Sequence, residues 1–306
     1  MLNELGKRIL VAVIGIPITL LVIYVGGILF FFVILLLANL TLFEFYKLAN
    51  RKNINPFIFV GLACNTIILI FYYFILQNSF VLNKSLFTIV LLFFVALLPA
   101  TLLFFQVWNK KPNTTVNVAY TILGIFWIAF VFSAILTVRF LPDYLKLFEK
   151  AEVFNLNYDF LGLTFQIDNL WSAKFFIVIL GTIWLCDTFA YFFGSAFGKH
   201  KLAPTTSPKK SWEGAIAGFI GSIISFSILD WLFKLNFSSG YQLLFASIVG
   251  IIGQIGDLAE SKIKREYNVK DSSNILPGHG GFLDRLDSIM FVFPATILII
   301  TLIALF

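Results

Sequence analysis

The sequence has 306 residues, of which 59% are hydrophobic and 12% are charged, and its formal net charge is +6. Soluble domains are about 45–50% apolar and about 25% charged, so these values exclude a soluble enzyme and a disordered chain. With two cysteines, a disulfide scaffold and a cysteine-based metal site are also excluded. The composition leaves an all-α polytopic membrane protein, because a membrane barrel would show alternating segments of about ten residues.

Nine apolar runs in the sequence approach the length of about 20 residues that a helix needs to cross a bilayer. In chain order, the predicted spans are residues 9–25, 28–48, 56–76, 85–105, 116–136, 171–193, 215–233, 241–258 and 286–305. They divide the chain into an N-terminal region of about five spans (1–136), an extracytoplasmic loop (137–170) and a C-terminal region of about four spans (171–306).

The basic residues predict the orientation of these spans. An odd number of spans puts the two termini on opposite sides of the membrane. The side that holds the N-terminus would carry 16 of the 22 lysines and arginines, and 10 of the 16 acidic residues. Because cytoplasmic loops are enriched in Lys and Arg, we expect the N-terminus and the whole charge surplus on the cytoplasmic side.

The first segment with unusual polar residues is 187–214. Asp187 lies inside an apolar run, and a carboxylate at mid-membrane costs about 2.5–3.5 kcal/mol. We therefore expect it to face a polar cavity, with a structural ion pair as the alternative. Lys209 and Lys210 precede a helix that Ser211 could cap, and an exposed helix N-terminus is a ready anion site. The alternative is that both lysines are ordinary charges that flank a span.

The second such segment is 257–287, which mixes acidic, basic and glycine residues. On a helix, one face would carry Asp257, Ser261, Lys264 and Arg265. Asp284 and Asp287 would share a face at the start of the last span. Between these two parts lies Pro-Gly-His-Gly-Gly, in which glycine N–H groups can approach an anion closely.

This mixture of residues indicates phosphoryl or nucleotidyl transfer. Such reactions use carboxylate oxygens to hold Mg²⁺ and cations to neutralise phosphate oxygens as charge develops. His279 could bond a phosphate or transfer a proton, and the alternative for it is a turn residue. For Glu260, Glu266 and Asp271, ion pairing in solvent is the competing interpretation.

The run from Ser261 to Asp287 resembles the signature of the CDP-diacylglycerol synthase (phosphatidate cytidylyltransferase) family. The residues that match the fixed positions of that signature are Ser261, Lys264, Arg265, Lys270, Asp271, Ser273, Leu276, Pro277, His279, Gly280, Gly281, Asp284, Arg285 and Asp287. The surroundings of Asp187 and residues 207–214 also resemble this family. Residues 1–170 resemble it in hydropathy alone.

The resemblance implies a reaction in which the phosphate of phosphatidic acid attacks the α-phosphorus of CTP, giving CDP-diacylglycerol and pyrophosphate. It implies a Mg²⁺-dependent nucleotidyltransferase with a neighbouring K⁺, and Asp257 and Asp284 would be the metal ligands. It also implies a homodimer in a bacterial cytoplasmic (inner) membrane, with no nucleic-acid partner. The polar cavity of the catalytic region 171–306 would open to the cytoplasm.

The hypothesis gives roles to two sets of residues. The catalytic set comprises Asp257, Asp284, Asp287, Asp187 and His279, in which Asp187 and Asp287 are additional or outer metal ligands. The substrate-binding set contacts or neutralises phosphates of CTP and lipid and comprises Lys209, Lys210, Ser211, Ser261, Lys264, Arg265, Lys270, Gly280, Gly281 and Arg285. The attacking phosphate is already an anion, so no strong general base is required.

Other functions stay open on the sequence. A related CTP-dependent polyprenol or dolichol kinase would transfer the γ-phosphate and release CDP instead of pyrophosphate. A transporter would place polar residues and broken helices near mid-membrane, often in paired halves, whereas here they crowd the cytoplasmic ends of the last four spans. A purely structural scaffold leaves the mixed cluster unexplained.

Overall fold

The computed structural model describes residues 4–77, 97–104, 107, 113–146, 167–275 and 280–305. Its helices are α1 (Glu4–Val25), α2 (Gly27–Asn50), α3 (Ile58–Leu76), α5 (Thr114–Arg139), α6 (Leu141–Leu145), α7 (Asn169–Phe197), α8 (Trp212–Phe233), α9 (Ser239–Ser247), the π-helical η3 (Ile248–Gly253), α10 (Gln254–Glu266), α11 (Phe282–Leu286) and α12 (Ile289–Leu305). Within these ranges, the strands β1 (Lys201–Ala203) and β2 (Ser207–Ser211) form a two-stranded sheet. The predicted all-α class is confirmed.

Six helices in the described part of the chain are long and apolar enough to cross a membrane. They are Gly27–Asn50, Ile58–Leu76, Thr114–Arg139, Asn169–Phe197, Trp212–Phe233 and the continuous helix Ser239–Glu266. The apolar helices Val13–Val25 and Ile289–Leu305 are shorter, and most of the predicted span 85–105 lies outside the described residues. A multi-pass membrane protein is thus confirmed, and the number of nine spans stays a prediction.

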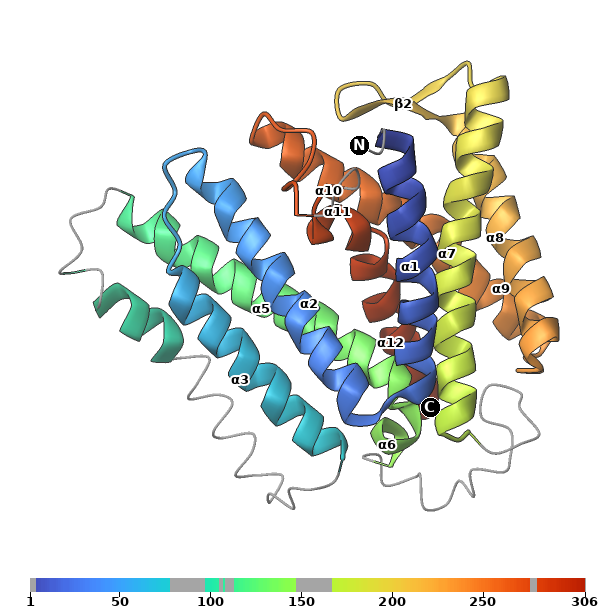
Figure 1. Cartoon of the computed structure of the whole chain (residues 1–306), viewed down its shortest axis with the longest axis horizontal. Coiled ribbons are helices and arrows are strands. Elements are labelled where there is room, and N and C mark those ends of the chain that lie inside the picture. Colours follow the sequence, from blue (N-terminus) through green and yellow to red (C-terminus); the bar gives the residue numbers. More distant parts are fainter. Residues whose placement is uncertain are drawn as a thin grey trace.

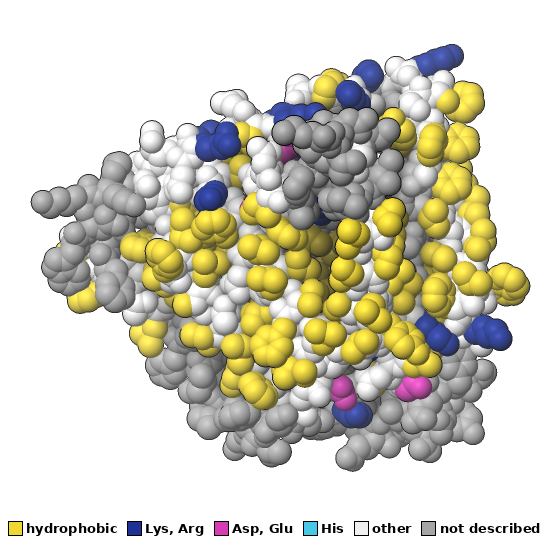
Figure 2. All heavy atoms as spheres, viewed as in Figure 1, with side chains coloured by type: hydrophobic (Ala, Val, Ile, Leu, Met, Phe, Trp, Pro, Cys, Tyr) yellow, Lys and Arg dark blue, Asp and Glu magenta, His cyan; other side chains and the backbone are white. Residues whose placement is uncertain are grey.

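The outer surface has the polarity that a bilayer requires. Figure 2 shows hydrophobic side chains across the middle of one face, with basic side chains along the upper edge and a few charged side chains below. The exposed large apolar side chains of the described residues include Ile28, Phe32 and Leu36 of α2. A contiguous apolar surface of this kind is unusual for a soluble monomer, and it matches the hydrocarbon core of a bilayer.

One hydrophobic core joins the N-terminal and the C-terminal helices. α5 packs against α2, α3 and α12, while α7 packs against α8. Figure 1 shows α1 and α12 between these two groups of helices. The large side chains buried in this core come from both groups and include Tyr46, Phe132, Phe175 and Phe293. The division at 137–170 stays a prediction, because much of that loop lies outside the described residues.

A π-helical segment, η3, interrupts the long helix that runs from α9 to α10. Such wide turns are uncommon and often occur at functional sites. Two glycines allow close packing of this helix against its neighbours. A Cβ at Gly250, in η3, would meet Ser222 of α8, and a Cβ at Gly256, in α10, would lie 2.8 Å from the carbonyl oxygen of Asp287. This packing brings Asp257 close to the start of α12.

The β1–β2 hairpin joins α7 to α8 and lies over one end of both helices (Figure 1). Its antiparallel strands pair Lys201 with Ser211. Ser211 caps α8 as predicted, because its Oγ accepts a hydrogen bond from Gly214 N at 3.2 Å. Glu213, in the first turn of α8, binds the backbone N and the ring Nδ1 of His200. These contacts fix the hairpin, and with it the lysines of β2, to the end of α8.

Candidate active site

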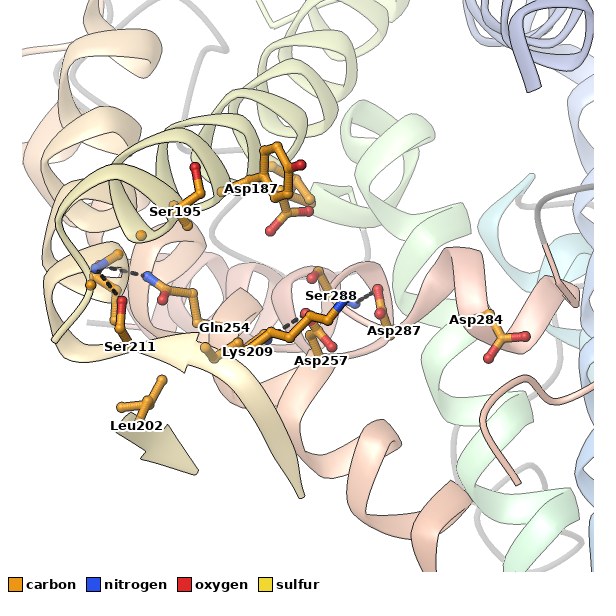
Figure 3. A pocket seen from close by; sticks show the side chains of 18 of the residues that line it. Asp187, Ser195, Leu202, Lys209, Ser211, Gln254, Asp257, Asp284, Asp287 and Ser288 are labelled. Carbon is orange, nitrogen blue, oxygen red and sulfur yellow. Dashed lines mark hydrogen bonds and ion pairs between the residues drawn. The ribbon is translucent and has the colours of Figure 1, made fainter. Parts of the chain in front are cut away.

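A cavity of about 880 Å³ lies between α7, the β1–β2 hairpin, α8, α10 and the segment that leads into α12 (Figure 3). The predicted site residues that line it are Asp187, Lys209, Lys210, Ser211, Asp257, Lys264, Asp284, Arg285 and Asp287. Lining residues that the sequence reasoning did not select include Ser195, Gln254 and Ser288. Residues that are far apart in the sequence thus meet at one polar cavity.

Among the described residues, five carboxylates line this cavity, and we call three of them, Asp187, Asp257 and Asp287, the cavity carboxylates. In Figure 3, Asp187 of α7 lies across the cavity from the other two. Lys210 Nζ forms an ion pair with Asp257 Oδ2, and Ser261 Oγ donates to Asp257 Oδ1 at 3.3 Å. Burial, and then the negative charge of Asp257, raises the pKa of Asp287. Neighbouring like charges of this kind favour the binding of a further cation.

Asp284 also lines the cavity, but the protein binds both of its oxygens. Oδ1 accepts a hydrogen bond from Lys264 Nζ at 2.6 Å. Oδ2 accepts hydrogen bonds from Ser272 N at 2.8 Å, Ser272 Oγ at 2.9 Å and Gly281 N at 2.7 Å. Burial raises the pKa of Asp284, but these hydrogen bonds outweigh it and hold the pKa below its ordinary value. Asp284 is therefore ionised at neutral pH and fixed in place.

Lys264 is buried between two carboxylates. Its Nζ lies 2.6 Å from Asp284 Oδ1 and 2.7 Å from Glu260 Oε2, and Glu260 is 2% exposed. The interpretation of Glu260 as a solvated ion pair is wrong, because helix packing encloses the pair. Glu266 does pair on the surface, with Lys52 at 3.4 Å. The charge of Lys264 is compensated by protein groups, and its contact with a substrate phosphate stays a prediction.

The structure adds a residue that the sequence reasoning missed, Glu44 of α2. Its side chain is fully buried. Hydrogen bonds to its carboxylate come from Ser272 Oγ at 3.0 Å, Ser273 Oγ at 2.6 Å, Phe282 N at 3.1 Å and Leu283 N at 2.8 Å. A signal for it was present, because Glu44 is the one acidic residue in the predicted span 28–48. An ionisable residue inside a span is by default a candidate for a functional site.

Known proteins are similar to this chain along nearly its whole length. The model of the cytidylyltransferase family matches residues 6–303. The chain belongs to the cytidylyltransferase family. A phosphatidate cytidylyltransferase of Bacillus subtilis (strain 168) is 32% identical over 293 residues, which are 95% of this chain and 96% of that protein. Proteins of the same name from Staphylococcus haemolyticus (strain JCSC1435) and Staphylococcus aureus (strain COL) are 52% and 49% identical over 112 residues, 37% of this chain and 43% of each relative.

In this member of the cytidylyltransferase family, several predicted substrate ligands have other contacts. Arg265 donates to Thr206 O at 3.3 Å and to Val269 O at 2.7 Å, so it braces the turn of the hairpin. Ser261 is bound to Asp257, and Lys270 is exposed. Substrate binding by these residues stays a prediction.

The glycines of the signature surround a protein carboxylate. Gly280 has a φ of 78°, and a Cβ there would lie 2.6 Å from Asp284 Oδ2. The N–H of Gly281 donates to the same oxygen. The close approach that glycine permits is therefore used to bind Asp284, and a contact of either glycine with substrate stays a prediction. His279 lies outside the described residues.

The donor set of the cavity fits the Mg²⁺ that the family resemblance implies. Mg²⁺ prefers oxygen ligands and usually takes one or two carboxylates together with substrate phosphates and water. Among the described residues, no group of three or more His, Cys, Asp or Glu side chains is arranged to hold a metal by itself. Asp257 with one further carboxylate fits an ion whose coordination a nucleotide completes. Asp284 would be this further carboxylate if its Oδ1 bound the ion in place of the hydrogen bond from Lys264.

Proposed function

We propose that this protein transfers the cytidylyl group of CTP to phosphatidic acid, forming CDP-diacylglycerol and pyrophosphate in phospholipid biosynthesis. The observation that carries the proposal is the similarity, over 95% of the chain, to a phosphatidate cytidylyltransferase. A cavity lined by carboxylates and cations supports it, because transfer of a nucleotidyl group uses both. A transporter or a scaffold would not require this combination at one end of the helices.

The proposed reaction is a single displacement at phosphorus. A phosphate oxygen of phosphatidic acid forms a bond to the α-phosphorus of CTP, the bond from that phosphorus to the bridging oxygen breaks, and pyrophosphate leaves with the electron pair. Lys209, Lys210 and Arg285 line the cavity and would neutralise the phosphate oxygens as charge develops. The attacking oxygen is already anionic, so the cavity carboxylates need not remove a proton from it.

Mg²⁺ is part of the proposal and would supply a Lewis acid that neutralises the phosphates of CTP. Asp257 would hold it together with Asp284, or with Asp187 or Asp287. Lys210 pairs with Asp257 and so holds this carboxylate at the cavity. A neighbouring K⁺ is proposed as a second ion, since the remaining carboxylate oxygens suit a hard cation.

The proposal includes an orientation in the bacterial inner membrane. The N-terminus and the cavity would face the cytoplasm, because that side then holds 16 of the 22 basic residues. A homodimer is proposed from the family resemblance. The exposed position 199, between α7 and β1, offers a test: a cysteine placed there should react with an impermeant reagent in inside-out vesicles and not in right-side-out vesicles.

The decisive experiment follows the label of CTP into lipid. The purified protein is supplied with Mg²⁺, CTP labelled at either the α- or the γ-phosphate, and either phosphatidic acid or a polyprenol as the acceptor. We expect labelled lipid from α-labelled CTP alone, with pyrophosphate released in equal amount. Labelled lipid from γ-labelled CTP with release of CDP, on a polyprenol acceptor, would identify the lipid kinase instead.

A further inference from the structure

Glu44 is bonded on both of its oxygens to one segment of the chain. Two donors are the hydroxyls of Ser272 and Ser273, and two are backbone N–H groups at the start of α11. These donors lie at 272–273, after α10, and at 282–283, in the first turn of α11. A buried carboxylate is costly unless hydrogen bonds or charges compensate it. The convergence of four donors therefore indicates a site that is built around this side chain.

Ser272 connects Glu44 to Asp284. Its Oγ lies 3.0 Å from Glu44 Oε2 and 2.9 Å from Asp284 Oδ2, and its backbone N donates to Asp284 at 2.8 Å. A hydroxyl has one proton to donate, so the two carboxylates share a single donor. Their positions consequently depend on each other.

The helix that Glu44 binds is short and carries cavity residues. α11 has five residues, Phe282–Leu286, and a helix of this length has little stability of its own. Arg285 of α11 and Asp287 directly after it line the cavity. Hydrogen bonds that the first turn of α11 donates to Glu44 therefore help to fix where these two side chains lie.

The approach between Glu44 and this segment is close enough to require glycine. A Cβ at Gly281 would lie 2.5 Å from Glu44 Oε2 and even nearer to Ser272 Oγ. No side chain fits at position 281 unless one of these groups moves. Glu44, Ser272 and Gly281 thus form one tightly fitted unit.

We propose that Glu44 is a positioning residue for the reaction, and this inference rests on the proposed cytidylyl transfer. It acts through Ser272 and the first turn of α11, which hold Asp284, Arg285 and Asp287 at the cavity. A helix of the N-terminal region thereby sets the geometry of the site. Misplacement of reacting groups by about 1 Å can lower a rate about 10²-fold. A change at Glu44 should therefore lower the turnover number, kcat.

The principal test is Glu44→Gln, which keeps the shape of the side chain and replaces an acceptor oxygen by an NH₂ group. We expect kcat per folded molecule to fall about 10- to 100-fold. The KM for CTP should change less than about threefold, because the lysines of β2 are untouched. Glu44→Asp, which retains the charge, should recover part of kcat. A purely structural role would lower the amount of folded protein and leave kcat per folded molecule unchanged.

Asp230→Asn is the matched control. Asp230 is another buried carboxylate of a spanning helix, 3% exposed, and it accepts hydrogen bonds from Phe237 N and Gln242 Nε2 away from the cavity. Asp230→Asn makes the same change from carboxylate to amide, and it should lower the melting temperature of the protein. It should leave kcat per folded molecule within about twofold of the wild type.

A double-mutant cycle tests the connection through Ser272. If Glu44 acts through this hydroxyl, the loss of kcat in Glu44→Gln combined with Ser272→Ala should be well below the product of the two single losses. Independent, multiplying losses would overturn the proposed route. The cycle can be run with Glu44→Asp if Glu44→Gln does not fold.

The outcomes separate this inference from the proposed function. Wild-type protein that makes no labelled lipid contradicts the function itself. An active wild type together with wild-type kcat in folded Glu44→Gln, or in folded Glu44→Asp and Ser272→Ala, contradicts the positioning role alone.

Discussion

The carboxylates at the cavity and beneath it form two groups, which differ in how many hydrogen bonds and ion pairs the protein itself makes to them. The cavity carboxylates border open space, and Lys210 is the cation paired with Asp257. Glu44 and Asp284 are buried, and each of their oxygens accepts hydrogen bonds from protein groups. An oxygen whose lone pairs are already used has little capacity for a ligand. Asp284 lines the cavity, but it would hold an ion only after Lys264 leaves Oδ1.

Removal of Mg²⁺ should have the largest effect on turnover. If the cavity carboxylates are poised for a metal–nucleotide complex, chelation should abolish the formation of labelled lipid, and added Mg²⁺ should restore it. The assay is incorporation of α-labelled CTP in the presence of a chelator, followed by titration with Mg²⁺. Undiminished turnover under chelation would contradict the assignment of the cavity carboxylates to metal binding.

Asp257→Asn should lower turnover by about 10³-fold. The substitution removes one charged oxygen from the proposed ion and leaves Lys210 without its partner. Both side chains are partly exposed, at 28% and 27%, so the lost ion pair should change the free energy of unfolding by less than about 1 kcal/mol. Turnover and thermal unfolding are measured on the same purified sample. A strongly destabilised variant would show that Asp257 belongs to the buried group after all.

Asp284→Asn should lower both turnover and stability, which distinguishes it from Asp257→Asn. It leaves the buried Lys264 with one carboxylate fewer, and breaking a buried pair typically costs about 3–5 kcal/mol. We expect a clearly lower melting temperature and a loss of turnover of about 10²-fold. Unchanged thermal unfolding would remove the distinction between the two groups and favour Asp284 as a plain metal ligand.

Lys209→Ala should have the smallest effect. Lys209 extends from the hairpin into the cavity (Figure 3), where loss of one charged contact to a phosphate should raise the KM for CTP about tenfold. Lys199→Ala is the matched control, because Lys199 is exposed nearby and is not among the lining residues. Equal kinetics in the two variants would show that the hairpin acts through its shape rather than through this charge.

Much of the fold and part of the site could be predicted because they depend on local patterns. The length of an apolar run reports directly on a spanning helix, so the predicted spans 28–48 and 171–193 correspond to α2 and α7. Asp187 could be selected because a charge inside such a run is conspicuous. The i, i+4 spacing likewise brought Asp257 and Ser261 together.

The contacts of Glu44 and Lys264 could not be predicted in this way. The hydrogen-bond partners of Glu44 lie 228 to 239 positions further along the chain, and no local pattern reports on such a contact. The helical face that Lys264 shares with Asp257 was evident from spacing, but which segment covers that face was not. The spacing therefore predicts a phosphate contact for Lys264, which stays a prediction, but it does not predict the ion pairs of Lys264 with Asp284 and Glu260.

The π-helical segment η3 gives the helix that carries Asp257 one place where the number of residues can change. Each residue of an α-helix turns the chain by about 100°, and a π-bulge holds one residue more than an α-turn. Because the wide turn absorbs this extra residue, loss of one residue from 248–253 would let the stretch become regular while α10 keeps its phase relative to α9. Asp257 would then still face Asp187 and Asp287. A second deletion would find no wide turn to absorb it, so it would rotate the face of α10 by about 100° and take Asp257 out of line with both.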